Sequence, residues 1–171
     1  MLRVVDAGRG SWLEEVYRRY APYVAAVVLR LSGRGSEVDD LVQDVFVEAA
    51  RGIERLRQPE AVKGWLATIA VRVCRRRLRL RRVKLLLGLD AGFDYSTLVD
   101  RSASPVDRIL LATVYRVLDE VAVEARVAFA LHHLEGETLE VVARLCGCSL
   151  ATAKRRVAAA QARLGEVFGD G

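Results

Sequence analysis

The stretch from Gly136 to Val157 constrains the fold most, because it predicts a helix, a tight turn and a second helix. Thr138 and Ser149 each precede one of these helices, and their side-chain oxygens are suited to accept hydrogen bonds from free backbone N–H groups. Gly147 lies between the helices, where a left-handed residue commonly ends a helix. The first helix has an apolar face at helical spacing, made of Leu139, Val142, Ala143 and Leu145. The segment is therefore expected to form two short helices packed across a turn.

The second predicted helix has an apolar face and a basic face. Apolar residues recur three and four positions apart and predict a buried stripe of Leu150, Ala153, Val157, Ala160 and Leu164. The opposite side and its flanks carry Thr152, Lys154, Arg155, Arg156 and Ala159. This layout predicts a helix-turn-helix whose second helix enters a DNA major groove, where arginine can read guanine edges and lysine can hold phosphate. The alternative is an ordinary helical hairpin with a solvated basic face.

The composition predicts an all-α protein. Of 171 residues, 52% are hydrophobic and only 3 are proline, which is ample for packed cores and compatible with long helices. No apolar run approaches the roughly 20 residues that span a bilayer, and the N-terminus lacks the apolar core of a signal peptide. We expect a soluble, cytoplasmic protein with no stable membrane insertion.

The three cysteines do not predict a disulfide framework. Cys146 and Cys148 flank the turn glycine, and their C-x-C spacing raises a metal or redox site as an alternative. The simpler interpretation is that these small residues pack between two helices. His132 and His133 end a predicted helix and are interpreted as structural or surface residues. The sequence therefore predicts no metal and no cofactor.

Charges are sorted along the chain. The formal net charge is +5, and no carboxylate occurs between Glu60 and Asp90. That interval holds Lys63, Arg72, Arg75, Arg76, Arg77, Arg79, Arg81, Arg82 and Lys84. The preceding stretch, residues 37–60, is rich in acids. A chain with this distribution is expected to contact two different partners.

The N-terminal part predicts three helices, over about 11–31, 36–56 and 62–83. Ser11 with Glu14 has the spacing of a capping box at the start of the first. In the second, Asp40, Gln43 and Asp44 lie three and four positions apart and share a face that carries no lysine or arginine. This face is either simply solvated or a docking surface for a basic partner.

The C-terminal part predicts four further helices, over about 106–122, 124–133, 139–145 and 150–167. Residues 89–105 are rich in turn-forming residues and are interpreted as a linker. The predicted architecture is two small helical domains, residues 1–88 and 106–171, with the helix-turn-helix in the second.

Three segments together resemble a known family. They are Asp39-Asp-Leu-Val-Gln-Asp-Val-Phe46, Trp65-Leu-Ala-Thr-Ile-Ala-Val-Arg72 and the helix-turn-helix segment 135–156. In this order they resemble the second and fourth regions of small bacterial RNA polymerase sigma factors of the extracytoplasmic-function (ECF) type. The likeness runs from about residue 13 to residue 164.

The resemblance implies a role for each segment. Region 2, within 1–88, would bind core RNA polymerase and the upstream melted promoter element, and region 4, within 106–171, would bind the distal element as duplex. The implied contacts to the polymerase clamp coiled coil are Asp40, Gln43 and Asp44. The implied contacts to promoter DNA are Arg72, Arg75, Arg76 and Arg79 in region 2, and Thr152, Lys154, Arg155 and Arg156 in region 4. The implied function is to direct polymerase to promoters and assist melting, under control of a separate anti-sigma protein.

The chain departs from the family pattern at several of these positions. Arg72 replaces a frequent asparagine and Arg76 a usual aspartate. Ala159 and Gln161 stand where basic residues are common, and Asp119 replaces a frequent proline. These departures leave the promoter sequence preference open.

No catalytic constellation is present in the sequence. It has no glycine-rich phosphate loop, no nucleophile paired with a base and no carboxylate pair in an apolar setting, so no enzyme activity is predicted. Two other classes of protein compete with the sigma-factor interpretation. A plain helix-turn-helix regulator would bind promoters without polymerase, and a sigma mimic that captures another regulator would bind neither polymerase nor DNA.

Overall fold

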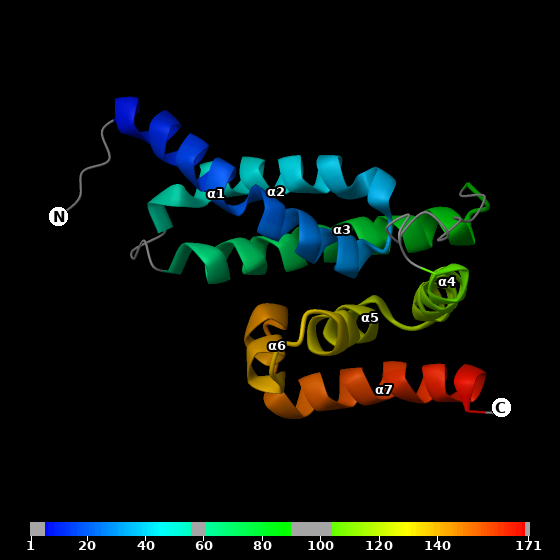
Figure 1. Cartoon of the computed structure of the whole chain (residues 1–171). Helices are drawn as coiled ribbons and strands as arrows, with labels where there is room; N and C mark the ends of the chain where they lie inside the picture. Colours follow the sequence, from blue (N-terminus) through cyan, green and yellow to red (C-terminus); the bar gives the residue numbers. More distant parts are fainter. Residues whose placement is uncertain (1–5, 56–60, 90–103, 170–171) are drawn as a thin grey trace.

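The computed structural model describes residues 6–55, 61–89 and 104–169, and every regular element in those ranges is helical (Figure 1). The α-helices are α1 (Asp6–Ser32), α2 (Val38–Gly52), α3 (Val62–Leu86), α4 (Pro105–Glu120), α5 (Val123–Phe129), α6 (Leu139–Cys146) and α7 (Leu150–Phe168). Short helical turns are η1 (Gly35–Glu37), η2 (Ile53–Arg55) and η5 (Ala130–Leu134). The predicted all-α fold is confirmed. Most of the predicted linker, residues 90–103, lies outside the described residues.

Helices α1, α2 and α3, here called the N-terminal half, pack on one another as a three-helix bundle. The second predicted helix faces the core as expected, because Leu41, Val45 and Ala49 are fully buried. The predicted start of the first helix is wrong. Helix α1 begins at Asp6, so Ser11 lies inside it and does not cap it.

Helices α4 to α7 form the C-terminal half. Ser104 caps α4, since its Oγ accepts a hydrogen bond from the Asp107 N–H at 3.1 Å, and Pro105 follows at the first helical position. Helix α5 continues into the wider turn η5, whose His132 Nδ1 lies 2.7 Å from the Glu137 carbonyl oxygen. The interpretation of His132 as structural is consistent with this contact.

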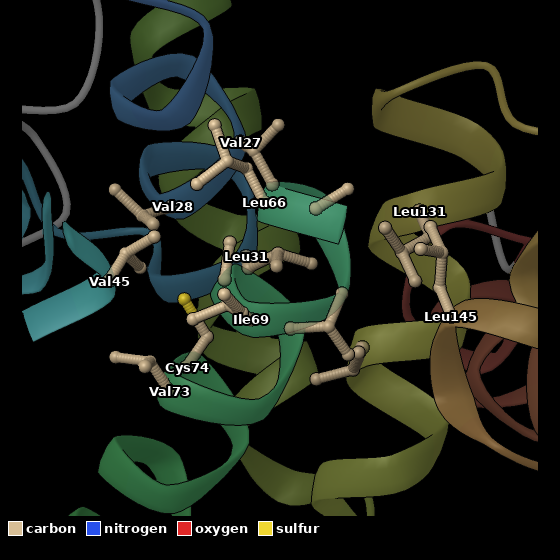
Figure 2. Close-up of a cluster of buried hydrophobic side chains, with 14 of the residues drawn as sticks. Val27, Val28, Leu31, Val45, Leu66, Ile69, Val73, Cys74, Leu131 and Leu145 are labelled. Atoms are coloured by element: carbon tan, nitrogen blue, oxygen red, sulfur yellow. The ribbon is translucent and has the colours of Figure 1, made fainter. Parts of the chain in front are cut away.

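The two halves pack against each other along α3. In Figure 1, α5 lies between α3 above and α7 below, and α3 also contacts α6. One hydrophobic cluster runs through both halves: Figure 2 shows Leu66 and Ile69 of α3 in the N-terminal half and, across from them, Leu131 and Leu145 of the C-terminal half. The arginine-rich helix therefore lies directly beside the C-terminal half.

Gly33 and Tyr115 make a second junction between the halves. Gly33 ends α1 with φ +69°, a left-handed conformation that glycine adopts without steric cost. The Tyr115 ring of α4 packs directly on Gly33, and its hydroxyl donates to the Arg30 carbonyl oxygen at 2.8 Å. A side chain at position 33 has no space.

The cysteines pack as predicted. Cys146 is buried in the shared hydrophobic cluster and Cys148 is half-buried against it. Burial raises the pKa of the Cys146 thiol, and burial raises that of Cys74 to about 12, so both stay protonated at neutral pH.

Candidate nucleic-acid interface

The acidic face of α2 is exposed, but it is not free of cations. Asp40 and Gln43 are exposed, whereas Asp44 is half-buried and lies 3.8 Å from Arg77 Nη2 of α3. The prediction that this face has no compensating cation is therefore wrong for Asp44. The cause is tertiary: Arg77 is remote in sequence and reaches Asp44 only because α3 packs on α2.

An apolar groove borders this acidic face. It is lined by Leu13, Tyr17, Asp39, Val42, Gln43, Phe46, Val47 and Ala50. Tyr17 and Phe46 meet edge to face with ring centroids 4.8 Å apart, and Tyr17 remains half-exposed. Gln43 belongs to both the groove and the acidic face. The groove was not predictable from the sequence, because its residues come from two helices.

The four arginines predicted to bind DNA divide into two pairs, each holding one glutamate. Arg72 and Arg76 hold Glu48 of α2, with Arg72 Nη2 2.5 Å from Oε2 and Arg76 Nη1 2.8 Å from Oε1. Burial raises the pKa of the Glu48 carboxyl, but the hydrogen bonds from these two arginines lower it by more than burial raises it. The pKa therefore lies below its ordinary value. Glu48 is thus ionised at neutral pH.

The second pair reaches into the C-terminal half. Arg79 Nη2 lies 2.5 Å from Glu124 Oε1 of α5, and Arg75 Nη2 lies 3.8 Å from the same oxygen. Arg75 also donates to the Cys146 carbonyl oxygen at 3.2 Å, at the end of α6. The hydrogen bond from Arg79 holds the pKa of Glu124 below its ordinary value.

These arginines still present guanidinium groups to solvent. The side chains of Arg72, Arg76 and Arg79 are each more than half exposed, while Arg75 is mostly covered. Together with Leu80 they line one shallow depression on α3. The structure therefore brings all four predicted residues together on one surface.

The helix-turn-helix forms as predicted. Thr138 Oγ1 accepts from the Val141 N–H, Gly147 adopts φ +63°, and Ser149 Oγ accepts from the Thr152 N–H at 3.2 Å. One predicted core position is wrong. Leu150 is 37% exposed, because it occupies the first turn of α7 at the edge of the packed stripe.

The four predicted region-4 residues differ in exposure. Lys154 and Arg155 are exposed, and neither forms an ion pair within the described ranges. Thr152 is half-buried, since its hydroxyl meets Ser149 Oγ at 3.0 Å, and Arg156 is also half-buried. Lys154 and Arg155 are therefore the side chains most available to an anionic ligand.

Two family models match the chain. Sigma-70 region 2 matches residues 16–83, and Sigma-70 region 4 matches residues 111–164. The ECF RNA polymerase sigma factor SigM of Mycobacterium tuberculosis is 32% identical over 164 residues, covering 95% of this chain and 80% of SigM. The chain belongs to the ECF family of RNA polymerase sigma factors.

The chain is also similar to a further relative and to two solved structures. The ECF sigma-E factor of Escherichia coli K12 is 27% identical over 148 residues, covering 81% of this chain and 77% of that protein. Among solved structures, the sigma factor RpoE of Bartonella quintana, in complex with the anti-sigma factor NepR, superposes with TM-score 0.66 at 25% identity, covering 91% of this chain and 96% of RpoE. CnrH, solved with the cytosolic domain of CnrY, has TM-score 0.61 at 20% identity, covers 96% of this chain and 92% of CnrH, and shares the fold.

Arg72 and Arg76 are linked through one carboxylate. Both hold Glu48, so the three side chains form one ion-pair cluster between α2 and α3.

Replacing Ser149 by alanine is expected to lower the free energy of unfolding by about 1 kcal/mol, because the Thr152 N–H loses its cap. Urea unfolding followed by circular dichroism measures the loss. Ser149→Asp is the control, since aspartate also accepts from this N–H and keeps most of the stability. An equal loss in both variants would contradict the capping role.

Proposed function

We propose that this ECF sigma factor directs core RNA polymerase to its promoters through three surfaces of the two halves. Residues 1–88 bind polymerase and the upstream melted element, residues 106–171 bind the distal element as duplex, and residues 89–105 link them. One observation carries the proposal. Helix α2 has an exposed face that is acidic and apolar, and the cationic surfaces lie on two other helices, α3 and α7. One anionic and two cationic surfaces suit a basic protein partner and two DNA contacts.

The polymerase contact is Asp40, Gln43 and Asp44, docked on the clamp coiled coil. Asp40 is the exposed charge of the three, while Asp44 already has Arg77 within 3.8 Å. Asp40 therefore contributes the strongest attraction to a basic partner. The adjoining groove supplies apolar area that the partner can bury, with half-exposed Tyr17 at its edge.

The DNA contacts are on two helices. Arg72, Arg75, Arg76 and Arg79 hold the upstream element as it melts. Thr152, Lys154, Arg155 and Arg156 hold the distal element, and Arg155 has the exposure needed to reach base edges. Each cation that neutralises a phosphate releases a condensed counterion, so binding is expected to weaken as salt rises.

The factor works by binding and performs no enzymatic reaction of its own. Because it acts with polymerase and promoter DNA, it works in the cytoplasm. Separately, no described helix combines the length and apolarity needed to cross a membrane. A separate anti-sigma protein controls it. Support for this comes from the similar sigma factor RpoE, whose structure was solved in complex with the anti-sigma factor NepR.

Run-off transcription with purified core polymerase and a library of promoter fragments tests the proposal. We expect transcripts that depend on this protein, and a loss of at least about tenfold with Asp40→Lys, because reversing a charge against a basic partner costs several kcal/mol. Glu14→Lys is the matched control: it makes a like change in the N-terminal half, at a carboxylate whose ion-pair partner among the described residues is Arg18 of its own helix.

Two results would contradict the proposal. Equal losses of transcription with Asp40→Lys and Glu14→Lys would contradict the docking of polymerase on α2. Tight binding to promoter duplex without polymerase, and no dependent transcript, would identify a plain helix-turn-helix regulator.

A further inference from the structure

The last turns of α3 expose large apolar side chains to solvent. Four of these side chains are each more than half exposed: Leu80, Val83, Leu86 and Leu87. Leu80, Leu86 and Leu87 are each three or four positions from Val83, so the four side chains lie together along one side of the helix. We call them the outer stripe. In Figure 1 this end of α3 lies at the right-hand edge of the molecule.

The opposite side of the same turns is packed against the protein. Leu78 and Arg81 are buried there, three positions apart. Arg81 and Arg126 of α5 both bind Asp119 of α4, and the three side chains form an ionic cluster between these helices. Because this side of α3 faces the core, the outer stripe points away from the protein.

Cations flank the outer stripe on both sides. Arg82 and Lys84 come directly before and after Val83, so their side chains leave the helix on either side of it. Both are exposed, and neither forms an ion pair in the part of the chain that the structure describes. Arg82 Nη1 donates to the Val121 carbonyl oxygen at 3.1 Å, a contact that leaves its charge in place. Helix α3 itself contains no carboxylate.

We propose that the outer stripe is a reversible membrane-binding surface, and that its ligand is the face of a bilayer that contains anionic lipid. The apolar side chains enter the boundary between the headgroups and the acyl chains, while Arg82 and Lys84 stay at the level of the lipid phosphates. Lying on a bilayer requires neither the length nor the continuous apolarity of a spanning helix. The absence of a membrane-spanning helix among the described residues is therefore compatible with this surface.

The geometry of this helix end favours lipid over a protein groove. Leu85, Leu86 and Leu87 are consecutive and each more than half exposed, and successive helical residues point about 100° apart. A groove on a protein covers one face of a helix, whereas fluid lipid adapts to side chains that diverge. The charge favours anionic lipid, because each lysine or arginine near such a surface strengthens binding about fivefold.

Co-sedimentation of the full chain with large unilamellar vesicles tests the proposal. Vesicles of phosphatidylcholine alone are compared with vesicles that also contain phosphatidylglycerol, and the bound fraction at rising lipid concentration gives a partition coefficient. The variants are Val83→Gln, Leu87→Gln and Val167→Gln. Val167→Gln is the matched control for Val83→Gln, because both valines are exposed in the last turn of a helix and neither change alters the charge.

We expect the unaltered chain to bind vesicles with phosphatidylglycerol at least about tenfold more tightly than vesicles without it, since two cations face the lipid. Leu87→Gln is expected to lower the partition coefficient about tenfold and Val83→Gln about fivefold, because less apolar surface is buried. Val167→Gln is expected to bind like the unaltered chain. Circular dichroism checks that each variant keeps its helices.

Failure of the unaltered chain to bind vesicles with phosphatidylglycerol would overturn the proposal. So would equal partition coefficients for Val83→Gln and Val167→Gln, since binding would then use another surface. A dimer in sedimentation equilibrium that Leu87→Gln dissociates, with no vesicle binding, would assign the outer stripe to a second copy of the chain. The vesicle measurement uses neither polymerase nor DNA, so its outcome is independent of the proposed function.

Discussion

Gly33→Ala is expected to lower the free energy of unfolding by about 2–4 kcal/mol, the sum of a left-handed conformation in a residue with a Cβ and overpacking against an aromatic ring. The backbone at Gly33 has φ +69°. A Cβ there would lie 2.6 Å from Tyr115 Cε1, well inside van der Waals contact. Tyr115 cannot easily retreat, because it is buried and its hydroxyl is held by the Arg30 carbonyl. Urea unfolding followed by circular dichroism measures the loss.

Gly136→Ala separates the two contributions. Gly136 has φ +74°, and no atom of the described residues would lie within 4 Å of its added Cβ. It is expected to cost about 1 kcal/mol, from the backbone conformation alone. Equal losses at the two glycines would show that Tyr115 gives way and would contradict tight packing at this junction.

Arg126→Met is expected to lower the free energy of unfolding by about 2–4 kcal/mol, because the carbonyl oxygens of Leu31 and Ser32 lose the hydrogen bonds that Arg126 donates. Methionine keeps the length of the side chain and most of its apolar contacts. It cannot donate to the Leu31 and Ser32 carbonyls, and the weaker contact from Arg81 at 3.4 Å remains. Equilibrium unfolding in urea measures the change.

Arg163→Met is the matched control for this substitution. Arg163 also bridges two carboxylates, Glu120 and Glu166, but all three side chains are solvent-exposed or nearly so. Little loss is expected there, since exposed ion pairs contribute little to stability. A stable Arg126→Met protein would show instead that apolar packing replaces the ionic cluster without cost, as is known for some buried ion pairs.

Several features of the fold were predictable because they depend on neighbours in sequence. The caps Thr138 and Ser149 and the left-handed Gly147 each act within one helical turn, so residue type and spacing determine them. The family assignment was predictable for the same reason, since its motifs are contiguous segments. The start of α1 was not predictable from Ser11, because a cap residue ends a helix only where the preceding backbone leaves the helical conformation, and here the helix continues back to Asp6.

The candidate site was predictable only in part. The residues of the site were predicted from the sequence, and the four arginines of α3 do share a surface. The carboxylates that pair with those arginines were not predicted. Their partners Glu48 and Glu124 come from α2 and α5, and ion pairs between residues remote in sequence leave no periodic signal. The pairing of Asp119 with Arg81 and Arg126 likewise joins residues of three helices and has no sequence signal.

By itself, the sequence determined the helical class, the helix-turn-helix, the separation of acidic and basic segments and the family. These follow from local hydrogen bonding, helical periodicity and contiguous motifs. Only the tertiary structure decided that Arg77 neutralises Asp44, that the C-terminal half lies against α3, and that Asp119 holds Arg81 and Arg126 together. The physical reason is that electrostatic energy depends on distance in space, and packing brings these charges together across long stretches of chain.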